Sequence, residues 1–423
     1  MTNQSTLALN GGPRAVQHAL PPMYPGGMRI GVEEETAVLE VLRSKRLFRY
    51  YGPNPGPSKA AELEQAFATH MGTRHALAVS SGSASLICGL VALGIGPGDE
   101  VIVPAYTWIA SASAVLATGA VPILAEVDES LTLNPTDVAA KISTHTRAIL
   151  LVHMRGAPCN MDALMALARQ HNLKVLEDVA QADGASYHGV RLGSIGDAGA
   201  FSFQFNKIIT CGEGGMVITN DETLFTRALM YHDVIGGKRN GVPDDEILPG
   251  LNFRMSELQA AVALAQLHKL DGLLTQMRER KAMLKASMDN VTARKGITFR
   301  TEHDAAGDAA ICMVFYLPEA QLAQQVSAAL SAEGLPAGVM HRSDRSDYHV
   351  YCDWQPVLGQ RTWSANGGPW RWHDGPVEYS RDMCPRTLDI LSRAVHFDVS
   401  PDLSSENVEE MAEALDKVLN ALV

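Results

Sequence analysis

Lys207 stands in a segment whose composition could support covalent chemistry. The alternating apolar residues 201–205 lead to this lysine, and the glycine-rich turn 212–215 follows it. Apolar surroundings disfavour the charged form of an amine and lower its pKa, which a Schiff-base lysine needs. A lysine that blunts pairing at a sheet edge is the alternative. This segment alone does not separate the two readings.

A second segment places a carboxylate at the end of an apolar run. Residues 174–178 read Lys-Val-Leu-Glu-Asp, and Gln181 follows Asp178 by three residues. An acid after a strand is also a common helix N-cap, and the segment taken alone favours that interpretation.

Two further segments could hold a phosphate and a planar ring. Ser80–Ser85 includes Gly82, Ser83 and Ala84, and it lies between an apolar run and a helical one. Backbone N–H groups at such a helix start bind anions, although a polar turn is the alternative. Trp108 follows the next apolar run and could stack on a ring, although a lone tryptophan usually packs in a core.

Together these four features indicate one cofactor. Pyridoxal 5'-phosphate (PLP) needs a Schiff-base lysine, an acid for its pyridine nitrogen, a phosphate site and an aromatic shelf. Lys207, Asp178, the turn at Gly82 and Trp108 would supply them.

Short apolar runs alternate with helical segments between residues 75 and 178, which predicts a mostly parallel sheet. Binding residues then gather at the carboxyl ends of the strands. The expected strands are 75–79, 100–104, 121–127, 147–153 and 174–178, and a helix is expected at 107–118. Residues 256–293 read as one long helix, and a smaller α+β domain should follow it. We expect an N-terminal arm at 1–30, a loop at 50–57, a large domain at 31–265 and a small domain at 266–423.

Composition narrows the class of protein. The 423 residues are 46% hydrophobic with a net charge of -12, which excludes disorder and disfavours nucleic acid or an anionic membrane as partner. The six cysteines form no CxxC pair, and the scattered histidines support no metal site. No signal pattern or apolar run of ~20 residues is present, so we expect a cytoplasmic protein.

The order of short motifs resembles the DegT family of sugar aminotransferases, which are fold-type I PLP enzymes. The matching segments span most of residues 1–265, and the last 150 residues match only in layout. They are 62–64, 81–84, 96–104, 177–181, 196–203, Lys207, 212–215 and 252–259. The resemblance implies a large domain built on a mostly parallel seven-stranded sheet.

The resemblance also implies roles for individual residues. Lys207 would bind the cofactor and act as the general acid and base, while Asp178 would pair with the pyridine nitrogen. The other implied contacts are Gln181 to the ring hydroxyl, Trp108 to the ring face, and Ser202 with Gly82, Ser83 and Ala84 to the phosphate. Asn252 would reach the phosphate of a neighbouring subunit, which implies a homodimer with shared sites.

The substrate is less defined. The layout is closest to the glutamine-dependent scyllo-inosose aminotransferases and the 3-amino-5-hydroxybenzoate synthases. His341, Arg342 and Arg155 could contact an anionic or hydroxylated substrate, or they could be ordinary surface residues.

We therefore expect amino transfer from L-glutamine or L-glutamate to a ketone of a sugar, cyclitol or related molecule. Such a reaction would belong to sugar, aminocyclitol or antibiotic biosynthesis. The alternatives are a PLP-dependent dehydratase or aromatising synthase, and a non-catalytic regulator with this fold. The presence of Lys207 argues against the family branch in which histidine replaces it, whose members are dehydratases.

Overall fold

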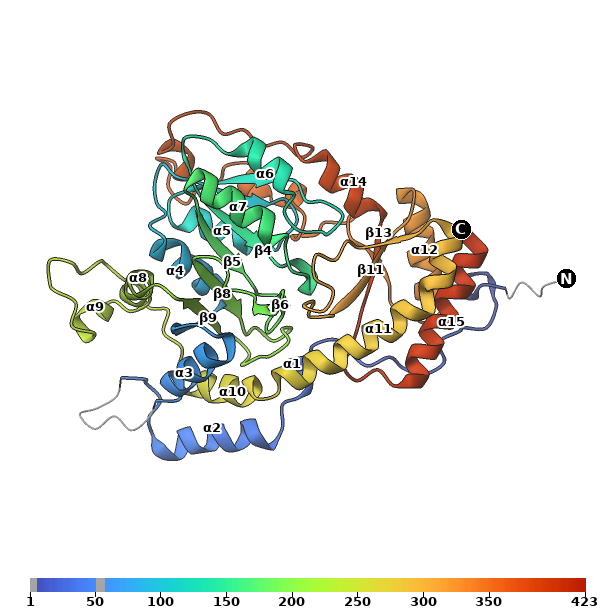
Figure 1. Ribbon diagram of the computed structural model, residues 1–423, viewed down its shortest axis with the longest axis horizontal. Coiled ribbons are helices and arrows are strands. Elements are labelled where there is room, and N and C mark those ends of the chain that lie inside the picture. Colours follow the sequence, from blue (N-terminus) through green and yellow to red (C-terminus); the bar gives the residue numbers. More distant parts are fainter. Residues whose placement is uncertain (1–5, 51–57) are drawn as a thin grey trace.

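The computed structural model describes residues 6–50 and 58–423, so the first five residues of the arm and residues 51–57 of the expected loop lie outside it. A seven-stranded sheet forms the centre of the larger part (Figure 1), with strand order β1-β9-β8-β5-β4-β2-β3. Only β9 runs antiparallel to its neighbours, β1 and β8. The strands are β1 (His75–Val79), β2 (Glu100–Pro104), β3 (Val121–Ala125), β4 (Thr146–Val152), β5 (Lys174–Asp178), β8 (Ala198–Ser202) and β9 (Gly215–Thr219). The expected mostly parallel sheet of seven strands is confirmed.

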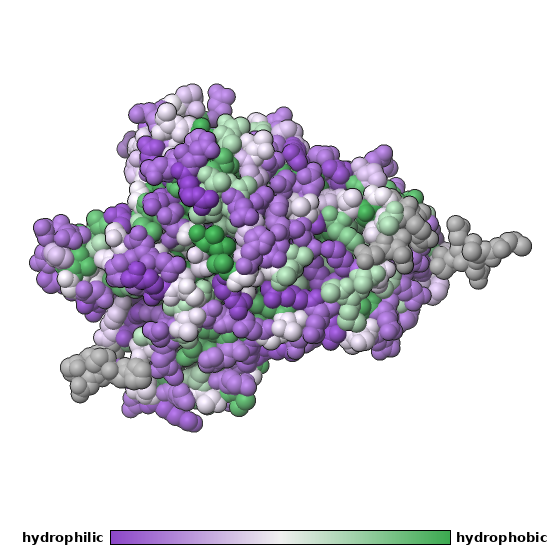
Figure 2. All heavy atoms as spheres, in the orientation of Figure 1, coloured by the Kyte–Doolittle hydropathy of each residue, from purple (hydrophilic) through white to green (hydrophobic). Residues whose placement is uncertain are grey.

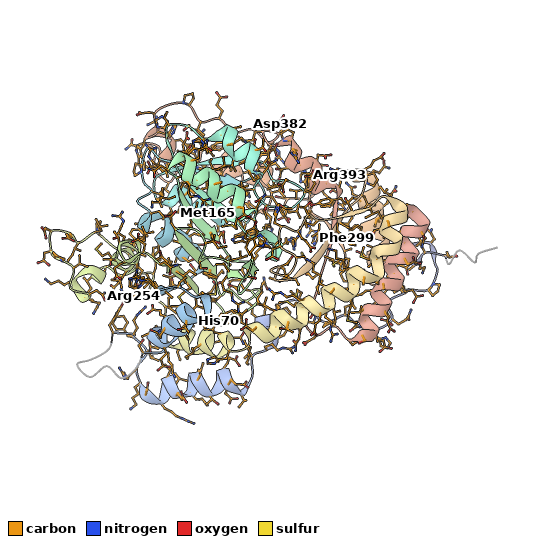
Figure 3. All side chains as sticks on the ribbon, in the orientation of Figure 1. His70, Met165, Arg254, Phe299, Asp382 and Arg393 are labelled. Atoms are coloured by element: carbon orange, nitrogen blue, oxygen red, sulfur yellow. The ribbon has the colours of Figure 1, made fainter. Side chains whose placement is uncertain are left out.

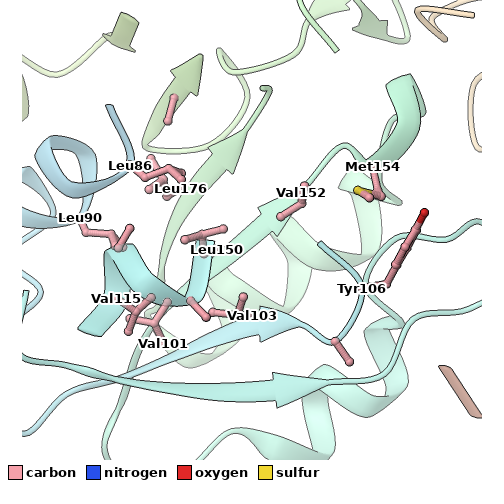
Figure 4. Close-up of a cluster of buried hydrophobic side chains, with 14 of the residues drawn as sticks. Leu86, Leu90, Val101, Val103, Tyr106, Val115, Leu150, Val152, Met154 and Leu176 are labelled. Carbon is pink, nitrogen blue, oxygen red and sulfur yellow. The ribbon is translucent and has the colours of Figure 1, made fainter. Parts of the chain in front are cut away.

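Side-chain alternation along the strands builds a core on each face of this sheet. Val101 and Val103 of β2 pack in one hydrophobic cluster, and Ile102 packs in the other. Figure 4 shows part of the first cluster, where Leu86 and Leu90 of the helix at residues 82–92 lie near Leu176 and Leu150. This face is covered by α4 (Gly82–Ala92), α5 (Ala110–Ala117) and α8 (Glu222–His232). The opposite face is covered by α3 (Lys59–Met71), α7 (Met161–His171) and α10 (Glu257–Leu267).

Short elements surround this sheet. The remaining ones in the larger part are α1 (Pro25–Met28), α2 (Val32–Ser44), α6 (Pro135–Lys141), η2 (Met154–Gly156), β6 (Ser186–Tyr187), β7 (Val190–Arg191) and α9 (Gly236–Arg239).

A four-stranded antiparallel sheet, of order β10-β11-β13-β12, forms the smaller part. Phe315 and Phe397 pack with Leu330 and Leu415 in a third hydrophobic cluster, which Val16 of the N-terminal segment joins. The strands are β10 (Thr298–Phe299), β11 (Cys312–Tyr316), β12 (Gly338–Val339) and β13 (Ala394–Asp398). The helical elements are η1 (Ala8–Asn10), α11 (Leu270–Lys295), α12 (Ala320–Ala332), α14 (Pro385–Arg393) and α15 (Ser405–Leu422). Between β12 and α14 the chain returns to the larger part, where η3 (Tyr351–Asp353) and α13 (Gln355–Leu358) join the first cluster and η4 (Pro369–Arg371) follows them. The expected α+β character is confirmed, while the domain limits at 30/31 and 265/266 stay predictions.

The single long helix expected over 256–293 is wrong. The chain forms α10 and α11 with a break at His268 and Lys269. The Lys269 amide bonds back to Gln266 O, only three residues away, and its ammonium group pairs with the buried Glu34 at 2.7 Å. This distant carboxylate stabilises the break.

The helix expected at 107–118 begins only at Ala110. The Thr107 and Ile109 amides donate to His349 O and Tyr348 O, so the backbone before α5 pairs with a segment that lies far along the chain. This contact fixes the chain just beyond β2.

Hydrophilic residues cover most of the face drawn in Figure 2, and hydrophobic residues form small groups between them. Within the described ranges, no helix combines the length and the apolar character needed to cross a bilayer. Figure 3 shows the side chains on the ribbon. Phe299 and Arg393 lie in the smaller part, and Arg254 lies on the opposite side of the molecule.

Candidate active site

The carboxyl end of β5 presents Asp178, which is 5% exposed. Its Oδ2 accepts a hydrogen bond from Ser111 Oγ at 2.9 Å, and its Oδ1 accepts one from the Ala180 amide at 3.1 Å. Burial raises the pKa of this carboxyl group above its usual range. No helix follows Asp178 directly, so the helix-cap alternative is wrong. The side chain is instead fixed at the sheet edge.

Asp183 lies close to this carboxylate and is fully buried. Neither of its carboxylate oxygens has a hydrogen-bond partner among the described residues. Burial raises the pKa of Asp183 well above normal, and the charge of Lys207 opposes that rise. A buried carboxyl group without a partner is costly unless it is neutral or faces a cation.

Lys207 lies in the turn that joins β8 and β9. The turn is closed by bonds from Phe205 N to Gly212 O and from Thr210 Oγ1 to Phe203 O. Neither β8 nor β9 is at an edge of the sheet, so the edge-strand interpretation is wrong. Burial lowers the pKa of Lys207, although Asp183 and Asp178 oppose the shift. The half-buried amine thus lies near two buried carboxyl groups, whose charges offset part of the fall in its pKa.

A small-residue cradle lies at the start of α4. Ser81 caps this helix by accepting from the Ala84 amide at 3.1 Å, which leaves the amides of Gly82 and Ser83 without a hydrogen bond within the described ranges. A Cβ atom on Gly82 would lie 2.7 Å from Ser202 Cβ, so only glycine permits this approach of α4 to β8. The helix start and the Ser202 hydroxyl together form a surface suited to an anion.

Gln181 joins the turn after β4 to the carboxyl edge of the sheet. Its Oε1 accepts a hydrogen bond from the Arg155 amide at 3.0 Å, so its amide nitrogen is the group left to contact a ligand oxygen. Arg155 Nε lies 3.3 Å from the Tyr106 hydroxyl. Figure 4 shows Tyr106 and Met154 beyond the ends of the strands that carry Val103 and Val152.

Trp108 is 49% exposed, so the core-packing alternative is wrong. Its ring lies against His349, with a centroid separation of 4.9 Å, and near Tyr348. Trp108 lies two residues before α5, the helix that carries Ser111. An exposed face of this ring remains available for a planar ligand.

Asn252 is exposed and lies opposite Asp233 in an isolated β-bridge. The Phe253 carbonyl accepts from the Ser80 amide at 2.8 Å, which brings this segment to the start of the phosphate cradle. Its reach toward a neighbouring subunit stays a prediction.

The two C-terminal substrate candidates lie in different environments. Arg342 forms a two-bond pair with the exposed Asp344, with distances of 2.9 and 2.6 Å, as an ordinary surface residue does. His341 is half-buried, and burial lowers its pKa. No described hydrogen bond joins either residue to Lys207, Asp178 or Gln181.

Sequence reasoning missed Asp183, Ser111 and Tyr106. Asp183 lies two residues beyond Gln181, in the same loop as Asp178, so its position was the available signal. Tyr106 follows the end of β2 and Ser111 lies in the first turn of α5, and their residue types carried no signal. In the described part of the chain, no group of three or more His, Cys, Asp or Glu residues is arranged to hold a metal.

Comparison with known proteins identifies the family. The sequence pattern of the DegT/DnrJ/EryC1/StrS aminotransferase family matches residues 28–365. The chain belongs to this family. The resemblance noted from short motifs is thereby confirmed, and the fold agrees with it.

Among curated relatives of this DegT family member, GDP-perosamine synthase of Caulobacter vibrioides is 46% identical over 213 residues, which is 50% of this chain and 56% of that enzyme. The match thus spans about half the length of that relative. L-glutamine:2-deoxy-scyllo-inosose aminotransferase of Streptomyces lividus is 41% identical over 289 residues, covering 66% of this chain and 67% of that enzyme. The crystal structure of 3-amino-5-hydroxybenzoic acid synthase superposes with a TM-score of 0.77 at 28% identity, over 96% of this chain and 100% of that one.

Enzymes of this family use PLP, and the residues present fit that cofactor. The cradle at Gly82 and Ser202 suits its phosphate, and Asp178 offers a fixed carboxylate for the pyridine nitrogen. Lys207 supplies a half-buried amine of lowered pKa near Asp178 and the unpartnered Asp183. The chain is thus a PLP enzyme of the DegT family.

Proposed function

We propose that this enzyme transfers an amino group from L-glutamine or L-glutamate to a ketone of a sugar, a cyclitol or a related small molecule. The observation that carries the proposal is the position of Lys207, a half-buried amine of lowered pKa near the carboxyl groups of Asp178 and Asp183. A neutral amine can both attach to a carbonyl compound and move a proton.

The bound PLP supplies an electron sink for the bonds at the donor carbon. Lys207 Nζ, as a neutral amine, takes the proton from the Cα atom of the donor. In the second half of the reaction it delivers a proton to the carbon that receives the amino group. Asp178, oriented by Ser111 and the Ala180 amide, keeps a negative charge opposite the ring nitrogen. Gln181, Trp108 and the cradle at Gly82, Ser83, Ala84 and Ser202 orient the ring and the phosphate.

The relatives support the substrate class. One acts on a deoxy-inosose with L-glutamine as its name states, and the other is named for perosamine. We infer an acceptor of that general type, in sugar, aminocyclitol or antibiotic biosynthesis. His341 and Arg342 stay proposed contacts to that acceptor.

We also infer a cytoplasmic homodimer with shared sites. Asn252 is the residue proposed to reach the partner's phosphate. Large apolar side chains are exposed around it, including Leu251, Val234 and Ile235. Exposed apolar groups of this kind mark interaction surfaces.

An aromatising synthase is the second candidate. The structural likeness to 3-amino-5-hydroxybenzoic acid synthase, which extends over 96% of this chain with a TM-score of 0.77, supports it. Water loss from the acceptor, rather than amine gain, would define that activity.

Product analysis separates these activities. The enzyme is incubated with L-glutamine or L-glutamate and a panel of cyclitol and sugar ketones, and products are identified by mass. Amino transfer predicts replacement of the ketone oxygen by an amino group together with a keto acid from the donor. Loss of water without gain of nitrogen would overturn the proposal and favour the synthase.

A further inference from the structure

Arg155 occupies a strained turn at the carboxyl end of β4. Its φ angle is +55°, a left-handed conformation that side-chain-bearing residues rarely adopt. Contacts from two parts of the chain hold it there. Gln181 Oε1 binds its amide at 3.0 Å, and Arg300 Nη1 donates to Arg155 O at 3.4 Å.

Arg300, which donates to the Arg155 carbonyl group, is itself fixed in place by other residues. Its guanidinium is 3% exposed and pairs with the buried Asp308 at 2.8 Å. The Ala309 amide also bonds to Gly156 O at 2.9 Å. The turn is therefore rigid, and Arg155 is oriented before any ligand binds.

The guanidinium of Arg155 lacks an anionic partner. Its hydrogen bond to the Tyr106 hydroxyl is the one side-chain contact that the described residues supply, and no carboxylate forms an ion pair with it. Tyr106 is 1% exposed and closes one side of the group. An arginine side chain has five N–H donors, and leaving most of them unpaired in a half-buried site is costly.

Among the described residues, the neighbouring carboxylates form no ion pair with the Arg155 guanidinium. Asp347 already binds His349 Nδ1 at 2.8 Å, and Asp398 of β13 acts on Arg155 only at longer range. Besides burial, the charge of Arg155 lowers the pKa of Lys207, and the Arg155 amide binds Gln181 in the loop that follows Asp178. The unpaired donors therefore belong to the site that contains Lys207.

We infer that Arg155 binds a carboxylate group of a substrate, through the guanidinium edge that Tyr106 leaves free. The planar fork of arginine matches a carboxylate with two parallel hydrogen bonds. The inference rests on the proposed function, and the carboxylate could belong to the amino donor or to an acidic acceptor. In either case Arg155 is a specificity-determining residue that selects an acid over an uncharged analogue.

Binding measurements on the enzyme loaded with pyridoxamine 5'-phosphate separate the two sources, because this form of the cofactor has no aldehyde for the donor amine to attack. Calorimetry gives the Kd of L-glutamine, as the donor, and of shikimate, as a ring acid that cannot be aminated, with myo-inositol as its uncharged counterpart. The variants are Arg155→Met and Arg155→Lys. The control is Arg147→Met, an exposed arginine near the other end of β4.

For Arg155→Met we expect the Kd of one acid to rise by about 10- to 100-fold, with partial recovery in Arg155→Lys. Weaker binding of L-glutamine alone would identify the donor carboxylate as the group that Arg155 binds. Weaker binding of shikimate alone would identify a carboxylate of the acceptor. Unchanged binding of both acids in a variant with wild-type cofactor absorbance and Tm would overturn the inference. Because binding is measured without turnover, this result is independent of whether the wild-type enzyme transfers an amino group.

Discussion

Ser111 Oγ donates a hydrogen bond to Asp178 Oδ2 across 2.9 Å, which joins the first helix after β2 to the end of β5. Both side chains are buried, so the bond is shielded from water. It fixes the carboxylate in one orientation at the sheet edge. We propose that this carboxylate pairs with the pyridine nitrogen and that Ser111 positions it.

Asp178→Asn should lower kcat by about 100-fold or more, because a preorganised charge at the reacting group contributes on that scale. Ser111→Ala should cost only about tenfold, since it loosens the carboxylate without removing it. Steady-state kinetics and the pH profile of kcat measure both effects. Ser113→Ala, an exposed serine on the same helix, is the control and should behave as wild type. Equal losses in the Ser111 and Ser113 variants would contradict the positioning role.

The cofactor-free protein should become more stable with rising pH because of Lys207. Burial lowers its pKa in the folded state, so between that value and the ~10.4 of an unfolded lysine the unfolded chain binds more protons. The free energy of unfolding therefore rises with pH in this window. Urea unfolding of the wild type and Lys207→Met at pH 7 and pH 9.5 measures the difference in slope.

The wild type should gain stability relative to Lys207→Met as pH rises. Lys238→Met changes an exposed lysine that pairs with Asp244, and it should keep the wild-type slope. Identical slopes for wild type and Lys207→Met would show that Lys207 is not desolvated.

Leu251→Arg should dissociate the proposed homodimer and weaken PLP binding. Leu251 is 49% exposed beside Asn252, and a charge there opposes burial against a second chain. Light scattering after size exclusion gives the mass, and cofactor titration gives the affinity. Leu9→Arg is a matched control on η1, where Leu9 is 60% exposed. A wild-type protein that is monomeric with full PLP affinity would remove the need for shared sites.

Glu126→Gln should lower the free energy of unfolding by about 1.5–3 kcal/mol, the scale of hydrogen bonds to a buried charge. Its carboxylate accepts from the amides of Arg386 and Thr387 and so joins the end of β3 to the start of α14. Glu129→Gln affects only an exposed pair with Arg386 and should change stability by less than about 0.5 kcal/mol. Urea unfolding compares the two, and equal effects would exclude a special role for Glu126.

Local patterns predicted the elements that create the site. The apolar runs that became β1, β2 and β5 end at Val79, Pro104 and Asp178, and each is followed by a residue type suited to a ligand. Strand periodicity and the residue types at strand ends depend on neighbouring residues, so a single sequence is enough to predict them.

Distant contacts could not be predicted in this way. The break before α11 depends on Glu34, which is 235 residues from Lys269. The unpaired state of Arg155 depends on which carboxylates fail to reach it, and the orphaned state of Asp183 depends on packing from several elements. Sequence showed that these residues are charged, but not that the fold would leave them without partners.

The central claim is that Lys207 holds PLP and mediates amino transfer. The direct measurement is the visible absorption spectrum of the purified enzyme, before and after addition of L-glutamine and then L-glutamate. The account predicts a band from the lysine-bound cofactor that converts to the pyridoxamine form with one donor, and loss of that lysine-linked band in Lys207→Ala. A wild-type protein that shows no band after reconstitution with PLP, or a Lys207→Ala variant that retains full transamination, would contradict it.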